Sequence, residues 1–372
     1  MIRVFVVDDS SFVCQLMADH LRSAPDMEVA GTARGGRRAL ELIKEMRPDV
    51  VTLDLEMPEM SGLETLERIM HECPVPVVLV SGVSRRAAQA TFDGINLGAI
   101  DFILKYAPGM DTDPDSLRQE ITSKVRAAAR VKIVRSIRSR RAPDVQEPSI
   151  KTTPVAVAST VQRNGKRASE FDARLFSDGV VIIGASTGGP LALRDLLGSL
   201  PADFPLGILI VQHMPAAFTP VLAAQLNRQV ALHVREAQEG DYITPGVALV
   251  APGDNHLRLN AGGRVRLDKQ PPVAGHRPSI DVTMGAAAAV YGTRTHAVVL
   301  TGMGSDGVQG LAVVKYKGGK TYAQDGPSCV INGMPQRAIE KGVVDHIAPP
   351  THIAKLLRLD CKQTLLLHST HC

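Results

Sequence analysis

Runs of apolar residues in the first 126 positions alternate with stretches in which apolar residues recur roughly every three or four positions. The apolar runs predict buried strands, and the spaced stretches predict amphipathic helices. We expect strands at 3–7, 28–30, 50–53, 75–80 and 100–104, and helices at 13–23, 37–45, 62–71, 87–97 and 116–128. This strict alternation predicts a parallel, doubly wound α/β sheet.

The same alternation returns after residue 178. There we expect strands at 180–183, 206–212, 247–251, 297–301 and 320–323, and helices at 191–200, 219–227, 282–291, 308–316 and 334–341. The second region also predicts a mostly parallel sheet, so the expected fold class is α/β with two doubly wound domains.

The segment that joins the two regions has a different composition. Every charged residue from Lys124 to Arg141 is basic, and we expect the preceding helix to continue to about residue 139. Residues 142–169 mix Pro, Thr, Ser, Gln and Ala without periodicity, which is typical of a flexible linker. We predict a first domain at 1–126, a basic helix extension and linker at 127–178, a second domain at 179–360 and a tail at 361–372.

Composition narrows the class of protein. The chain has 372 residues, of which 44% are hydrophobic and 22% charged, and no apolar run has the length of a transmembrane helix, so we expect no membrane insertion. The net charge of +4 is mild and the basic segment lacks aromatic residues, which argues against a nucleic-acid partner. Five cysteines without metal-ligand spacing, and a chain that starts directly in a strand without a signal peptide, predict a reduced, cytoplasmic location.

Polar residues follow the expected strands of the first domain. Asp8 and Asp9 follow the first strand, Asp54 the third, Ser81 the fourth and Lys105 the fifth. These positions meet at the carboxyl edge of a parallel sheet, and three carboxylates there need a hard cation such as Mg²⁺ or a shared proton. One carboxylate could attack a phosphoryl donor while the metal and the lysine stabilise the transferring group. The alternative interpretation is a set of solvent-facing loop carboxylates.

A serine flanked by glycines opens the second domain. Residues 180–183 predict a strand, Gly184-x-Ser186-x-Gly188 predicts a tight turn, and Pro190 suits the first turn of the helix that follows. Such a turn exposes a nucleophilic hydroxyl beside a helix N-terminus, whose N–H groups favour a developing oxyanion. The alternative is a glycine-rich turn that binds a phosphate or a nucleotide.

Two further strand ends carry the residue types that activate a serine. His213 follows the strand at 206–212, and Asp306 lies in a glycine-rich loop after the strand at 297–301. His213 would act as general base toward Ser186, and Asp306 would hold the imidazole and stabilise its cation. Backbone N–H groups near Thr187 and Met303 would bind the oxyanion. The order Ser, His, Asp differs from that of α/β-hydrolases.

The remaining histidines of this domain divide into two groups. We expect His233, His296 and His346 to be packing residues, because each lies in or beside a predicted strand or an apolar segment. His256 and His276 lie in polar loop sequences and are candidates to line the site.

The first domain resembles the response-regulator receiver domain, a flavodoxin-like fold. The resemblance rests on Val6-Val7-Asp8-Asp9-Ser10, on Leu53-Asp54-Leu55-Glu56-Met57-Pro58 and on Lys105. It implies that Asp54 is the phosphoacceptor and that a histidine kinase is the phosphodonor. It also implies that Asp8, Asp9 and Asp54 hold Mg²⁺ with the backbone carbonyl of Glu56, and that Ser81 and Lys105 contact the phosphoryl group. Phe102 matches the aromatic switch position, whereas Tyr106 stands where the family usually has proline.

The second domain resembles the catalytic domain of the chemotaxis protein-glutamate methylesterases/protein-glutamine glutaminases. The matching motifs are those around Ser186, Gln212-His213-Met214, Ala251-Pro252-Gly253, His276-Arg277-Pro278-Ser279-Ile280-Asp281, 301–307 and Gly333-Met334-Pro335. The resemblance implies hydrolysis of glutamate γ-methyl esters and deamidation of certain glutamines on the cytoplasmic helices of chemoreceptors, with Ser186, His213 and Asp306 as the triad.

The same resemblance implies control of this activity. The receiver would cover the active site until Asp54 is phosphorylated, and the esterase step would need no cofactor. Two alternatives remain at this point: a chemosensory-like pathway that controls something other than motility, and a second domain that only binds a partner.

Overall fold

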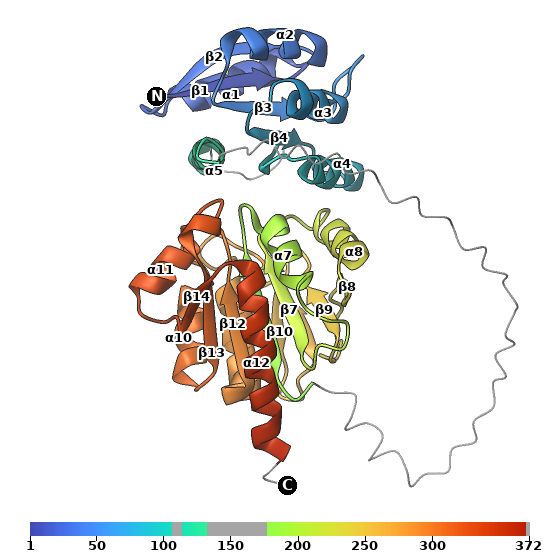
Figure 1. Cartoon of the computed structure of the whole chain (residues 1–372), viewed down its shortest axis with the longest axis vertical. Coiled ribbons are helices and arrows are strands. Elements are labelled where there is room, and N and C mark those ends of the chain that lie inside the picture. The colour runs from blue at the N-terminus through green and yellow to red at the C-terminus, as the bar shows by residue number, and fades with distance from the viewer. Residues whose placement is uncertain (106–113, 132–176, 370–372) are drawn as a thin grey trace, which may run out of the picture.

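The computed structural model describes residues 1–105, 114–131 and 177–369. It contains two α/β domains that lie against each other (Figure 1). The predicted fold class is confirmed, because each domain is built on a sheet of parallel strands with helices on both faces.

The first domain has a five-stranded sheet in the order β2-β1-β3-β4-β5. Its elements in chain order are β1 (Ile2–Val7), α1 (Ser11–Arg22), β2 (Met27–Ala33), α2 (Gly36–Met46), β3 (Val50–Asp54), α3 (Gly62–Glu72), β4 (Val77–Ser81), α4 (Arg85–Asn96), β5 (Asp101–Leu104) and α5 (Pro114–Ala128). Helices α1 and α5 cover one face of the sheet, and α2, α3 and α4 cover the other. The chain reverses its strand order beside β1, and this puts the ends of β1 and β3 next to each other.

The second domain has a seven-stranded sheet in the order β14-β13-β12-β6-β7-β9-β8. Its elements are β6 (Val180–Ala185), α7 (Gly189–Leu197), β7 (Gly207–Gln212), α8 (Thr219–Gln229), β8 (His233–Glu236), β9 (Val247–Val250), β10 (His256–Leu259), β11 (Val265–Asp268), α9 (Ile280–Tyr291), β12 (Thr295–Val299), α10 (Val308–Tyr316), β13 (Lys320–Gln324), α11 (Met334–Glu340), β14 (His346–Ala348) and α12 (Pro350–Ser369). Helices α7, α8 and α12 pack on one face, and α9, α10 and α11 pack on the other. Strands β10 and β11 form a separate antiparallel pair.

Two expectations about the elements need correction, and four short strands were not predicted. Helix α12 runs to Ser369, so the boundary expected at 360 falls inside it; the buried side chains of Leu357 and Cys361 anchor this helix on α7 and the sheet. Strands β8, β10, β11 and β14 have only three or four residues each and had no clear signal in the sequence. Helix α5 ends at Ala128 rather than continuing unbroken, and residues 132–176, with most of the expected linker, lie outside the described residues.

Two further observations bear on the sequence-based expectations. Within the described residues, no helix is both long enough and apolar enough to span a membrane. Cys14, Cys73, Cys329 and Cys361 are free thiols, whereas Cys372 lies outside the described residues.

Candidate active site and receiver site

The turn that carries Ser186 connects β6 to α7. Gly188 has φ +76°, and a Cβ there would lie 2.6 Å from the Val330 side chain, so only glycine fits. Pro190 lies in the first turn of α7, where its missing N–H costs no hydrogen bond. The strand, the turn and the helix around Ser186 are therefore arranged as the sequence predicts, and the side chain lies at the N-terminal end of α7.

His213 and Asp306 meet at the same edge of the sheet. They follow β7 and β12, the strands on either side of β6, and His213 Nε2 lies 2.8 Å from Asp306 Oδ2. Ser186 and His213 line one cavity of about 460 Å³. His213 Nδ1 is buried and has no hydrogen-bond partner among the described residues, so this is the nitrogen left to accept a proton. The sequence-based expectation that these side chains gather at one sheet edge agrees with the structure.

Asp306 is held by donors from several segments. These are His213 Nε2, the Ser279 hydroxyl and the backbone N–H groups of Ile280, Asp281 and Gly307, at 2.7 to 3.1 Å. Burial alone would raise the pKa of this carboxyl, but the hydrogen bond from His213 and the backbone N–H groups outweigh burial and hold the pKa below its usual range. The carboxylate therefore stays charged and fixes the orientation of the His213 ring. Ser279, for which no role was expected, is the N-cap of α9, and a serine before an apolar helix is a common N-cap signal.

A second histidine ring covers His213. The His276 ring stacks on it with centroids 3.8 Å apart and an angle of 7° between the planes. His276 lines the Ser186 cavity as predicted, and it also lines a neighbouring cavity of about 390 Å³. Burial, with the charge of His213, lowers the pKa of His276 to about 4, so the ring is neutral at neutral pH.

The other histidines follow the predictions only in part. His256 does not line the site: it is fully buried in β10, and its ring lies within hydrogen-bonding distance of the Pro271 carbonyl oxygen and the Ser279 N–H. His296 is a buried packing residue, as expected, beside Tyr322. His233 is exposed at the start of β8, so the packing role expected for it is wrong.

The low pKa of His276 predicts a pH dependence of stability. The unfolded chain binds a proton on this residue near pH 6.5, whereas the folded chain does so only near pH 4. Between these values the unfolded state binds more protons, so the free energy of unfolding falls as the pH is lowered. We expect His276→Phe, which keeps a stacked ring, to make this decline shallower in urea titrations of the full chain at pH 4 to 6.5. Equal slopes of unfolding free energy against pH in wild-type protein and His276→Phe would contradict the prediction. His296 is a second buried histidine whose pKa is about 4, so His296→Phe should also make the decline shallower.

The two residues expected to bind the oxyanion line the same cavity as Ser186. Thr187 is buried and follows the serine, and its carbonyl oxygen accepts a hydrogen bond from Thr301 Oγ1 at 2.9 Å. Met303 is 41% exposed at the other side of the cavity. Gln212, which the sequence placed only in a matching motif beside His213, donates from Nε2 to the Ser186 carbonyl oxygen at 2.8 Å and so ties the serine turn to β7.

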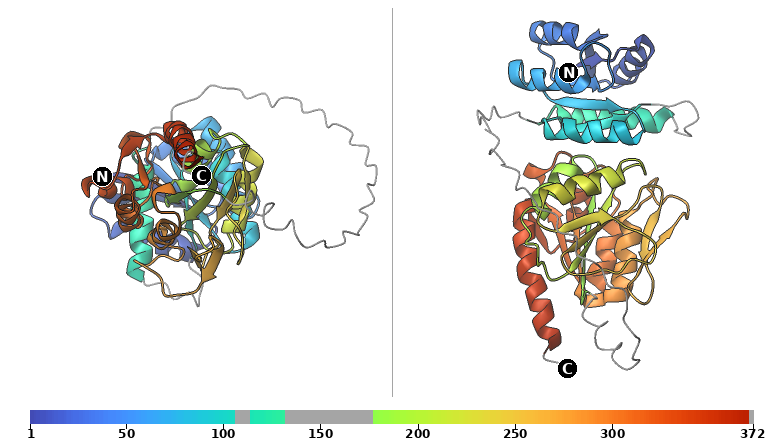
Figure 2. Two further views of the ribbon diagram at one scale, coloured as in Figure 1. Left: turned by 90° about the horizontal axis from the view of Figure 1, so that it is seen from below. Right: turned by 90° about the vertical axis from the view of Figure 1, so that its right-hand side faces the viewer.

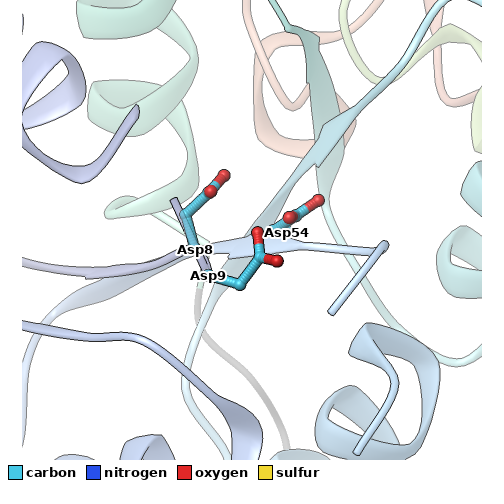
Figure 3. Close-up of side chains that lie close together, drawn as sticks. All are labelled: Asp8, Asp9 and Asp54. Carbon is cyan, nitrogen blue, oxygen red and sulfur yellow. The ribbon is translucent and has the colours of Figure 1, made fainter. Parts of the chain in front are cut away.

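The three carboxylates of the first domain gather as predicted (Figure 3). Asp8, Asp9 and Asp54 each have an oxygen within 4.8 Å of the others, which fits a hard cation with oxygen ligands such as Mg²⁺. Lys105 Nζ lies 2.6 Å from Asp54 and 3.1 Å from Asp8. Burial raises the pKa of Asp54 to about 6, although Lys105 and the Glu56 N–H partly offset this effect. The arrangement can hold a metal ion and present the Asp54 carboxylate to a phosphoryl donor.

Ser81 makes its contacts within the first domain, whereas Phe102 contacts the second domain. The Ser81 hydroxyl accepts a hydrogen bond from Thr91 Oγ1 of α4 at 2.7 Å instead of contacting Asp54. Phe102 stacks on Phe218, the residue before α8, with centroids 4.9 Å apart and an angle of 4° between the rings. Phe218 was not anticipated from sequence. Tyr106, which stands where the family usually has proline, lies outside the described residues.

The first domain lies against the second (Figure 2), and some of its residues line one side of the Ser186 cavity. Asp101, Gln119 and Lys124 from β5 and α5 line it opposite Ser186 and Thr187. Burial alone would lower the pKa of Lys124, but the charges of Asp101 and Glu120 outweigh it and raise the pKa, so the lysine stays charged. The cavity at Ser186 is therefore lined in part by polar and charged side chains of the other domain.

Comparison with known proteins identifies both domains. The receiver-domain family of response regulators matches residues 4–121, and the CheB methylesterase family matches residues 181–357. The protein-glutamate methylesterase/protein-glutamine glutaminase of Symbiobacterium thermophilum is 42% identical over 95% of this chain and 95% of its own length. That of Halalkalibacterium halodurans is 41% identical over 97% of this chain and 99% of its own length.

A solved structure is similar to the second domain. The crystal structure of the Thermotoga maritima CheB methylesterase catalytic domain is 44% identical, covers 48% of this chain and 97% of that chain, and has a TM-score of 0.47. The two family matches and the nearly full-length relatives agree on one assignment. The chain belongs to the protein-glutamate methylesterase/protein-glutamine glutaminase family, carboxylic ester hydrolases that carry a response-regulator receiver domain.

Proposed function

We propose that the chain removes methyl groups from glutamate γ-methyl esters on the cytoplasmic helices of chemoreceptors and deamidates specific glutamines at the same site. The observation that carries the proposal is the hydrogen bond between His213 and Asp306 at the cavity that Ser186 lines. A serine, a histidine and a buried carboxylate at one sheet edge are the groups that acyl transfer to a hydroxyl requires.

The chemistry proceeds in two steps. The Ser186 oxygen attacks the ester carbonyl while His213 Nδ1 takes the hydroxyl proton, and Asp306 stabilises the resulting imidazolium. The C–O bond to the methoxy group breaks, and methanol leaves with the proton from His213. Water then attacks the acyl-serine, which releases the glutamate carboxyl and restores Ser186. With a glutamine substrate the leaving group is ammonia. Backbone N–H groups at Thr187 and Met303 would bind the oxyanion in both steps.

We further propose that the receiver domain controls access to this site. In the closed arrangement, Phe102 and Lys124 lie at the domain interface, and the receiver covers the cavity that holds Ser186. A histidine kinase would supply the phosphoryl group to Asp54, and Ser81 and Lys105 would contact it. Mg²⁺ held by Asp8, Asp9, Asp54 and the Glu56 carbonyl would offset the negative charge of the phosphoryl group. Movement of Ser81 and Phe102 toward the phosphoryl group would weaken the contact with Phe218 and α8.

The activity and its control can be tested in one assay. We expect purified full-length protein to release methanol from a methylated chemoreceptor fragment, and a small-molecule phosphodonor with Mg²⁺ to raise the rate about 10-fold to 100-fold. This range corresponds to about 1.4 to 2.8 kcal/mol of preference for the closed arrangement. Asp54→Asn should remove the activation, because an amide cannot accept the phosphoryl group.

A matched variant separates loss of the phosphoacceptor from general loss of charge. Asp19→Asn removes an exposed carboxylate on α1, whose only ion pair within the described residues is with Arg22, and should leave the activation intact. If unphosphorylated wild-type protein and Asp54→Asn both run at the phosphorylated rate, control by occlusion is wrong. If folded protein that takes up phosphate releases no methanol at all, the ester substrate is wrong.

A further inference from the structure

Helices α9 and α10 start side by side. Backbone N–H groups in the first turn of each helix donate to a carboxylate of the other segment. Asp306, just before α10, accepts from the Ile280 and Asp281 N–H groups in the first turn of α9. Asp281, in that first turn, accepts from the Gly310 N–H in the first turn of α10 at 2.6 Å. The first N–H groups of a helix have no partner within the helix, so each carboxylate satisfies donors that the other helix leaves open.

The start of α10 depends on this exchange. Its N-cap residue is Gly307, which has φ +95° and no side chain to act as a cap, and its first turn contains no acidic residue. Gly310 allows the two helices to come together, because a Cβ there would lie 2.6 Å from Met284 Cβ and 3.1 Å from Asp281 Cα. Asp281 therefore holds the first turn of α10 through the Gly310 N–H, while Asp306 accepts from the N–H of the N-cap residue Gly307.

The loop that enters α10 carries two groups of the active site. Met303 lines the Ser186 cavity, and Asp306 holds the His213 ring at 2.8 Å. Asp306 lies two residues before α10, so a shift of the α10 N-terminus moves this carboxylate relative to His213. Misplacement of a catalytic group by about 1 Å can cost about 100-fold in rate.

We propose that Asp281 is a positioning residue for ester hydrolysis: it holds the N-terminus of α10 and thereby keeps the Asp306 carboxylate in place against His213. The proposal rests on the function proposed above and names a further residue that this function needs. Burial raises the pKa of the Asp281 carboxyl, and the neighbouring charge of Asp306 raises it further. The two helix N-termini offset the repulsion between these carboxylates.

The test compares two substitutions in the full chain, assayed with phosphodonor and Mg²⁺. Asp281→Ala removes the acceptor and should lower kcat about 10-fold to 100-fold with little change in KM. Asp281→Asn keeps an oxygen that can accept from Gly310 N–H and should recover most of kcat. Asn227→Ala is the matched control, because it removes another side-chain acceptor of a backbone N–H, that of Val234, away from the cavity, and it should keep the wild-type kcat.

A double-mutant cycle distinguishes positioning from general stability. If Asp281 acts through Asp306, Asp281→Ala should cost less than about threefold in an Asp306→Asn background. Unchanged kcat in Asp281→Ala, an equal loss in Asp281→Asn, or full additivity in the cycle would overturn the proposal. These results all require an active wild-type enzyme, so they are distinct from a failure of the proposed function, in which wild-type protein releases no methanol.

Discussion

Replacing Ser186 with alanine is expected to lower kcat for methanol release by about 10⁴-fold or more, because alanine offers no oxygen to attack the ester carbonyl. The fold should survive the change: within the described residues the Ser186 hydroxyl makes no hydrogen bond, and the turn is fixed by its backbone and by Gly188. Methanol release by phosphorylated protein from a methylated receptor fragment measures the effect, and the unfolding midpoint verifies the fold.

Ser199→Ala is the control for this experiment. Ser199 lies just after α7, where its hydroxyl donates to the Asp195 carbonyl oxygen at 2.9 Å, and its loss should leave kcat unchanged. Release from Ser186→Ala at more than a few per cent of the wild-type rate would show that another group attacks the ester. The serine would then be only part of the turn.

Asp306→Asn is expected to lower kcat by about 10⁴-fold while KM changes little. The hydrogen bonds that the structure shows at Asp306 come from donors, among them His213, Ser279 and the start of α9, and the amide nitrogen of asparagine cannot accept from them. The His213 ring would then lose the acceptor that fixes its orientation and balances the charge it gains. Kinetics of methanol release as a function of substrate concentration separate kcat from KM.

The comparison for this variant is Asp268→Asn. Asp268 is a hydrogen-bonded carboxylate in β11 that pairs with Arg258 and does not line the Ser186 cavity. We expect this change to leave kcat at the wild-type value. A kcat for Asp306→Asn above about a tenth of the wild-type value would contradict the triad, as would a loss that appears only in KM.

The sequence predicts the parts of the site that depend on local order along the chain. Ser186, His213 and Asp306 each follow an apolar run, and parallel strands carry such positions to one edge. Asp8, Asp54 and Lys105 come together for the same reason in the receiver. Their roles in catalysis and in phosphoryl transfer remain predictions that the experiments above address.

The sequence could not predict contacts that join distant segments. The stacking of His276 on His213 depends on how the loop after β11 returns across the sheet edge, which no local spacing encodes. The pairing of Phe102 with Phe218 depends on how two separate domains dock. His256 was predicted to line the site because its polar neighbours are typical of a loop. It lies instead in β10, which pairs with β11, and it is fully buried there.

The stacked contact between Phe102 and Phe218 has a consequence for the receiver itself. If phosphorylation of Asp54 favours the open arrangement by some factor, thermodynamic reciprocity requires that opening favours phosphorylation by the same factor. Under the control proposed above, the closed interface would oppose phosphorylation, because part of the free energy of phosphorylation would go into separating the two rings. By the same reciprocity, a substrate that binds only when the domains are apart would favour phosphorylation of Asp54, so under the proposed function the methylated receptor would promote the active state of the enzyme.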